Sequence, residues 1–349
     1  MNHIPIMRKY LFTGILLMMM ACNNNDSKPN TANINISFEL KRFDKDFFAI
    51  DTMKMDSSLN QLKIAYPEFL ADYLDRIIGI DRSDSNNENQ IKLFIHDYMP
   101  IHDSISKIEK GIAMAYDENM EALKRVKYYF PAYQLPKQFI TFIGPMDAFA
   151  NTPTGGHGDI ITSYAICSGL QLHLGSESSF YQSELANQLY PSYISQRFNT
   201  DFIAINCMKN IIDDIYPPKY IDLSLLDIMV DQGKRMYLLD LLLPDTKPEL
   251  KLGYTKEQLN GSMENEAFIW NFFTENNLLY EKDQIKMRSF IGDGPNTQEL
   301  GEGSPGFISL FVGKQIIHKY MKLNPETSIE KLLSMNASTL LTESKYKPK

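Results

Sequence analysis

With 349 residues, 44% of them hydrophobic, the chain is long and apolar enough to bury a substantial core. Its 43 acidic residues outnumber its 35 basic ones, and the formal charge of −8 argues against electrostatic binding of nucleic acid. The same negative charge would be repelled by an anionic lipid surface.

Residues 1–21 have the order of a bacterial lipoprotein signal peptide. Arg8 and Lys9 precede the apolar run 10–20, which is shorter than the roughly 20 residues that span a bilayer. The residues just before Cys22, Met-Met-Ala, resemble a lipobox. We therefore predict cleavage before Cys22 and attachment of acyl chains such as palmitate to its sulfur. The alternative is an uncleaved anchor or an ordinary signal peptide.

Cleavage would leave 43 acidic and 33 basic residues, a formal charge of −10, so the lipid itself must hold the protein to the membrane. Two or three acyl chains suffice, since each buried methylene contributes about 0.8 kcal/mol. Residues 22–35 are rich in Asn, Asp, Ser and Thr and are predicted to form a flexible tether. Residues 36–349 are expected to form a single globular domain.

The first half of the domain combines helices with the predicted sheet. Alternation of apolar and polar residues over 34–40 predicts a half-buried strand. Helical spacing of apolar residues follows over 59–73, over 89–99, where Pro100 should end the helix, and over 104–126. Further strands are predicted over 138–144, 159–167 and 170–175, the last two as a hairpin.

The second half is predicted to be helical. Asp201 could cap a helix over 202–216, and Asp222 a helix over 223–243. Two more helices are expected over 255–275 and 306–321. The fold class is therefore α+β, mostly helical and packed around one small, mainly antiparallel sheet. Cys167 and Cys207 lie in apolar stretches, which favours two buried thiols over a disulfide.

A search for catalytic motifs finds no CxxC, Walker loop, GxSxG or HExxH, and no two histidines have the spacing of helical metal ligands. Asp227 and Asp231 lie four residues apart on a predicted helix. A carboxylate pair of this kind could serve acid–base chemistry, but the order Asp231 then Arg235 is also that of a structural ion pair.

Several segments of the chain together resemble one protein family. They are 41–48 (KRFDKDFF), 66–69 (YPEF), 227–237 (DIMVDQGKRMY), 252–255 (LGYT), 304–306 (SPG), 312–317 (VGKQII) and 344–348 (SKYKP). The family that they resemble is the GldB gliding motility-associated lipoproteins of Bacteroidetes. The resemblance extends from the lipobox almost to the last residue, and it implies an envelope role associated with surface gliding, with no assigned catalytic residue.

The order of sheet, helix, link and helix is also similar to that of predicted Zn-dependent proteases. In those proteins one helix carries HExxH and the next a Glu-Gly pair. On this chain Asn206, Cys207 and Asn210 fall at the HExxH positions and Gln232 at the position of the glutamate. The likeness thus implies a degenerate zincin-like scaffold without its metal ligands, because amides are poor zinc ligands. The alternative is that two helices fall in this register by chance.

These patterns favour a non-enzymatic, lipid-anchored envelope protein without a cofactor, needed for gliding motility or associated secretion machinery and bound to other proteins of that apparatus. One alternative is an exported metallopeptidase-like hydrolase with scattered ligands such as His157, His173 and Asp231. Another is a ligand-binding lipoprotein with a pocket between the sheet and the helices.

Overall fold

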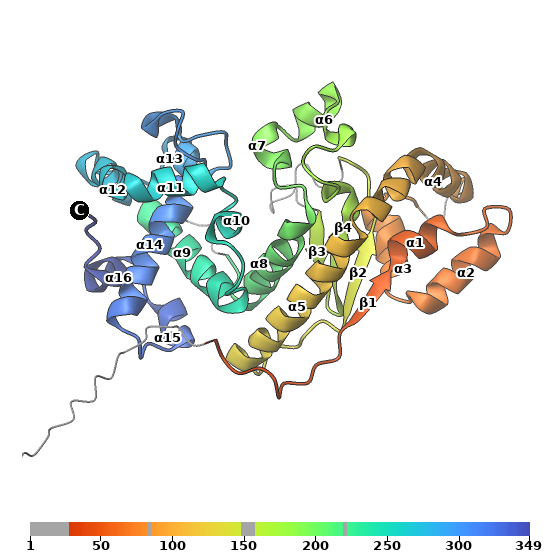
Figure 1. Cartoon of the computed structure of the whole chain (residues 1–349), viewed down its shortest axis with the longest axis horizontal. Coiled ribbons are helices and arrows are strands. Elements are labelled where there is room, and N and C mark those ends of the chain that lie inside the picture. Colours follow the sequence, from red (N-terminus) through yellow and green to blue (C-terminus); the bar gives the residue numbers. More distant parts are fainter. Residues whose placement is uncertain (1–27, 82–84, 148–157, 219–221) are drawn as a thin grey trace, which may run out of the picture.

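Four short strands form a single sheet in the computed structural model, which describes residues 28–81, 85–147, 158–218 and 222–349. The strand order is β1-β2-β4-β3. Helices surround this sheet, so the fold is of the predicted α+β class (Figure 1). The strands are β1 (Glu39–Arg42), β2 (Gln138–Phe142), β3 (Asp159–Ile161) and β4 (Ala165–Gly169).

The sheet is mixed, and the prediction of a mainly antiparallel sheet was wrong. β2 pairs in parallel with both β1 and β4, and only β3 and β4 are antiparallel. Alternating hydrophobicity identifies a strand but not its direction. The direction here follows from the helical excursion over residues 43–137, which returns the chain to the same end of the sheet.

Two strand boundaries also differ from the sequence prediction. β1 begins at Glu39, because Glu39 pairs with Gln138 at the start of β2 and earlier residues have no partner in that strand. The predicted hairpin of strands 159–167 and 170–175 was wrong, because the segment predicted as its first strand contains β3 and most of β4, which pair with each other. Residues 170–175, predicted as a strand, contain the 3-10 turn η3 (Leu170–Leu172) instead.

The first half of the chain packs helices against both faces of the sheet. Tyr116 of α5 lies against Phe139, with ring centroids 6.5 Å apart, whereas Phe69 of α3 packs on Phe142 from the other face. In Figure 1, α1 to α4 lie at one end of the molecule. The elements are α1 (Phe43–Phe48), α2 (Met55–Ala65), α3 (Phe69–Asp72), the π-helix η1 (Tyr73–Ile77), α4 (Asn87–Ser104), η2 (Ile105–Lys107) and α5 (Glu109–Tyr129).

Pro100 does not end its helix as predicted. It lies inside α4, on the exposed side. Proline removes one hydrogen bond, to the carbonyl four residues earlier, and here that residue is the exposed His96, whose carbonyl can be hydrated. The long helix predicted over 104–126 is divided by the 3-10 turn η2, so α5 begins only at Glu109.

The second half of the chain is helical, as predicted, and occupies the other end of the molecule (Figure 1). Its elements are η4 (Ser179–Tyr181), α6 (Glu184–Leu189), α7 (Ser192–Ser195), η5 (Thr200–Phe202), α8 (Ile203–Ile215), α9 (Leu225–Leu242), α10 (Pro248–Leu252), α11 (Lys256–Glu264), α12 (Glu266–Glu275), η6 (Leu278–Tyr280), α13 (Gln284–Ile291), η7 (Gln298–Leu300), α14 (Ile308–Leu323), α15 (Ile329–Ser334) and α16 (Ala337–Ser344).

The residues that cap these helices differ from those predicted. Ser224, not Asp222, caps α9, and Asp227 completes a capping box with it. Asn199, not Asp201, caps the turn η5 that leads into α8. The helix predicted over 255–275 is two helices, divided at Asn265.

Two glycines allow α9 and α14 to touch backbone to backbone. A Cβ atom added to Gly233 would overlap the carbonyl of Gly313, and one added to Gly313 would overlap the carbonyl of Met229. Both glycines lie in segments that carry the family resemblance. The sequence therefore uses glycine here to bring two long helices closer than any side chain would permit.

We expect Gly233→Ala to lower the free energy of unfolding by about 1–3 kcal/mol or more, since the helices must separate to admit a methyl group. Urea denaturation measures this change. Gly261→Ala on α11 is the matched control: nothing lies within 4 Å of its added Cβ, so it should raise stability by about 0.5–1 kcal/mol. Equal shifts in the two variants would contradict the proposed role of Gly233.

Candidate functional site

A pocket of about 340 Å³ lies between α8 and α9. From α8 it receives Asn206, Lys209, Asn210 and Asp213, whose spacing of three and four residues places them on one helical face. From α9 it receives Gln232, Arg235, Met236 and Leu239 by the same rule. The rest of the wall is mostly apolar and comes from other elements: Ile194, Phe198, Phe202, Leu252, Phe307 and Leu310.

Two ion pairs border this pocket. Arg197 pairs with Asp293, across 96 residues of sequence. Arg235 donates to Asp213 at 2.5 Å and to Asp231 at 2.9 Å, and its guanidinium lies over the ring of Tyr216. Because both arginines are held by carboxylates, their guanidinium groups are fixed in position.

Lys209 differs from these arginines. Its ammonium group makes no hydrogen bond or ion pair with any residue in the part of the chain that the structure describes. Burial and the nearby Arg197 lower the pKa of Lys209 to about 8, against the opposing effect of Asp293 and Asp213. The lysine is therefore a half-buried cation that lacks a direct counterion.

The buried residue Asp159 lies behind the pocket, at the start of β3. Side chains from three other parts of the chain lie within hydrogen-bond distance of it. His173 Nε2 lies 2.9 Å from Asp159 Oδ2, and Asn206 Nδ2 donates to the same oxygen at 2.8 Å. Ser168 donates to the other oxygen at 2.5 Å, and Asn210 donates to the Asp159 backbone carbonyl at 2.8 Å. This network fixes α8 to the edge of the sheet.

The serine, histidine and aspartate of this network do not form a catalytic triad. In a triad the histidine lies between the other two and accepts the serine proton. Here Asp159 lies between Ser168 and His173, so the hydroxyl contacts the carboxylate and not the imidazole of His173. Although burial opposes protonation of His173, the carboxylate of Asp159 outweighs it and raises the pKa of the imidazole.

The residues that align with a zinc protease motif have structural contacts. Asn206 and Asn210 donate to Asp159, and Gln232 Oε1 accepts a hydrogen bond from Ser309 at 2.7 Å. These three residues do line one pocket. Cys207 is fully buried outside that pocket, where burial raises the pKa of its thiol well above the ordinary value. Cys167 is also buried, and neither cysteine forms a disulfide, as predicted.

The scattered ligands of the alternative hydrolase are not collected into a metal site within the described ranges. His157 lies outside the described residues, His173 is bound to Asp159, and Asp231 is bound to Arg235. Throughout residues 28–81, 85–147, 158–218 and 222–349, no three His, Cys, Asp or Glu side chains lie close enough to hold a metal ion. Asp227 serves in the capping box of α9 and accepts from the backbone N–H of Ser224.

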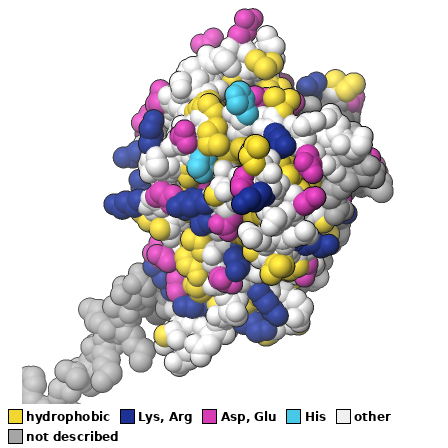
Figure 2. Space-filling view, turned by 90° about the vertical axis from the view of Figure 1, so that its right-hand side faces the viewer, with side chains coloured by type: hydrophobic (Ala, Val, Ile, Leu, Met, Phe, Trp, Pro, Cys, Tyr) yellow, Lys and Arg dark blue, Asp and Glu magenta, His cyan; other side chains and the backbone are white. Residues whose placement is uncertain are grey.

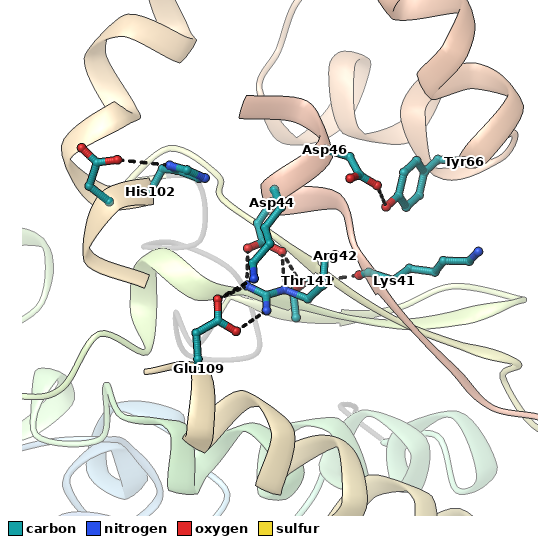
Figure 3. Close-up of polar contacts among 10 residues, drawn as sticks. Lys41, Arg42, Asp44, Asp46, Tyr66, His102, Glu109 and Thr141 are labelled. Carbon is teal, nitrogen blue, oxygen red and sulfur yellow. Dashed lines mark hydrogen bonds and ion pairs between the residues drawn. The ribbon is translucent and has the colours of Figure 1, made fainter. Parts of the chain in front are cut away.

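The resemblance segment 41–48 forms a second polar cluster, at the other end of the sheet (Figure 3). Arg42 donates in bidentate fashion to the buried Asp44, at 2.7 and 2.9 Å, and also to Glu109 at the start of α5. Thr141 of β2 donates to Asp44 as well. The cluster thus joins β1, α1, β2 and α5 through one buried carboxylate, and its contacts are structural.

Comparison with known protein families identifies the chain. The family described as "Gliding motility protein GldB", a lipoprotein family by its name, matches residues 24–348. The chain belongs to this family. Comparisons with curated proteins and with solved structures found no match. The predicted family resemblance is therefore confirmed over nearly the whole chain, whereas the zincin-like scaffold finds no support among solved structures.

Family membership makes the protein a gliding motility-associated lipoprotein. Cys22, the predicted lipid attachment site, lies outside the described residues. Each helix in the described part of the chain is too short or too polar to cross a bilayer.

Sequence reasoning did not identify Asp159, which is the centre of the buried hydrogen-bond network, or Lys209, the lysine that lines the pocket. Lys209 carries a signal in retrospect, since it is the one charged residue between Ile203 and Ile212, the first ten residues of α8. The ion pair of Arg197 with Asp293 carries none, because it joins two loops that are distant in sequence.

The contact of His173 with Asp159 should make stability depend on pH. A histidine whose pKa is raised on folding contributes stability below its ordinary pKa of about 6.5, and the contribution is lost as the pH rises through the folded value. We expect urea denaturation between about pH 5 and pH 9 to show this decline in the unmodified protein but not in His173→Gln.

The matched control is His96→Gln, at an exposed position on α4, which should keep the decline. If His173→Gln has the same pH profile as the unmodified protein, the ion pair with Asp159 does not contribute.

Proposed function

We propose that the protein is a non-enzymatic component of the cell envelope, held to a membrane by lipid on Cys22 and bound to other proteins of the gliding motility or associated secretion machinery. The observation that carries this proposal is the family match, which begins two residues after Cys22 and continues to residue 348. A lipobox directly before a lipoprotein family domain has a simple explanation in a protein that is exported and anchored.

The contacts in the pocket support a binding role over a catalytic one. Most groups in or beside the pocket that could act as acids, bases or nucleophiles are engaged with one another, Ser168 and His173 with Asp159, and Asp213 with Arg235. Among the described residues, Lys209 is an exception. A catalytic group needs a free lone pair or proton directed at the substrate. The engaged side chains instead join secondary structure elements.

The surface at the end of the molecule formed by α1 to α4 supports specific protein contacts rather than a diffuse electrostatic attraction. Figure 2 shows acidic, basic and apolar side chains interspersed on this face. Exposed apolar residues there include Met53, Ile64 and Leu93. A mixed surface of this kind binds through local complementarity, since a field of a single sign is absent from the face shown.

Lipid anchoring is tested by Cys22→Ser, which removes the acylated sulfur and should move the protein from the membrane to the soluble fraction of lysed cells. Fractionation and labelling with a palmitate analogue measure the change. The control is Asn24→Ser, two residues along, which should stay labelled and membrane-bound. Firm membrane attachment of Cys22→Ser would contradict the assignment.

Partner binding is tested by a crosslinked pull-down from native envelopes, with Cys22→Ser as the control. We expect reproducible capture of motility or secretion proteins, reduced in the control because the untethered protein loses its high local concentration. Deletion should also abolish spreading in a gliding host. Normal spreading of the deletion strain would refute the motility role. Stoichiometric zinc in the purified protein, lost in His157→Ala, would favour the hydrolase instead.

A further inference from the structure

The pocket between α8 and α9 has a polar wall and an apolar wall. The polar wall comes chiefly from α8 and α9, with Lys209, Asp213 and Arg235, and it is completed by His173, Arg197 and Asp293 from other parts of the chain. The apolar wall comes from Ile194, Phe198, Phe202, Leu252, Phe307 and Leu310. At about 340 Å³ the pocket has the size of a small-molecule site. A molecule that fills it must therefore be small and amphiphilic.

The charged residues of the pocket determine whether it binds an anion or a cation. Both arginines of its wall are paired with carboxylates, Arg197 with Asp293 and Arg235 with Asp213 and Asp231. Lys209 lies near both pairs but has no direct partner among the described residues, and burial of its ammonium group lowers its pKa. An anion beside Lys209 would supply the missing counterion.

The same pairing also selects the kind of anion. Phosphate groups are bound most strongly by guanidinium groups in bidentate geometry. Arg197 already holds Asp293, and Arg235, which holds Asp213 and Asp231, keeps only its Nη2 without a hydrogen bond among the described residues. A single ammonium, which acts as a point charge, suits a carboxylate with one negative charge. The amide groups of Asn206 and Asn210 are engaged with Asp159, so Lys209 is the group on α8 that remains for recognition of the anion.

We propose that this pocket binds a medium-chain fatty acid, with its carboxylate at Lys209 and its aliphatic chain against the apolar wall. The proposal is independent of the lipid on Cys22 and of the identity of the protein partners. It adds a small-molecule site to a protein whose family name records only motility.

The test uses the full chain with Cys22→Ser, which carries no acyl chains, and isothermal titration calorimetry with three eight-carbon probes. Octanoate should bind, and octanol should bind about ten- to hundredfold more weakly because it lacks the charge that pairs with Lys209. Octylammonium should bind no better than octanol, since it brings a like charge. Equal or tighter binding of octanol or octylammonium would overturn the proposal.

Variants of the two walls separate the contributions. Lys209→Met should weaken octanoate about ten- to hundredfold and leave octanol unchanged, whereas Ile194→Asn should weaken both. Lys63→Met, at an exposed lysine on α2, is the matched control and should change neither. Unchanged octanoate binding in a folded Lys209→Met protein would overturn the assignment. If that variant fails to fold, the comparison of the three probes on the unaltered pocket still decides.

A peptide that ends in leucine with a free carboxylate distinguishes a fatty acid from a protein C-terminus. We expect it to bind more weakly than octanoate. Tighter binding of the peptide would overturn the assignment to a fatty acid and would indicate that the pocket binds the C-terminus of a protein.

Discussion

The contact between the backbones of α9 and α14 is the constraint on which the second half of the molecule depends. Gly233 and Gly313 lie where any side chain would force the two helices apart. Gln232, beside Gly233, is held by Ser309 of α14, and Arg235 then faces α8 across the pocket. The close helix contact thus fixes the position of one pocket wall, and the residue type that makes it possible is also the one that favours a helix least among non-proline residues.

Buried carboxylates join the secondary structure elements of the first half of the chain to one another and to the second half. Asp44 joins β1, α1, β2 and α5 through Arg42, Thr141 and Glu109. Asp159 joins β3 to α8 and to the turn after β4. Removing one partner from such a cluster leaves a buried charge uncompensated, which is far more costly than losing a surface pair. The geometry of the sheet edges therefore depends on a few specific polar side chains as well as on apolar packing.

The sequence predicted those features that local patterns encode. Amphipathic spacing located most of α5, a capping signal near its start located α9, and the apolar surroundings of Cys167 and Cys207 predicted buried thiols. Strand direction was not predictable, because β1 and β2 are neighbours in space but almost a hundred residues apart. The pocket was anticipated only in part: its amide residues were identified through a resemblance to zinc proteases. The contacts that define its chemistry, from Asp159 to His173 and from Arg197 to Asp293, join segments that no local pattern relates.

The N-terminal segment bears on how the anchored domain would face the membrane. Lys28 forms an ion pair with Asp245 of the C-terminal half, and Thr31 is buried. The lipid that we propose on Cys22 would be separated from Lys28 by six residue steps, which extend to about 20 Å at most. So short a connection would keep the side of the domain near Asp245 close to the bilayer. The α1 to α4 end would then lie to the side, within reach of neighbours in the same membrane.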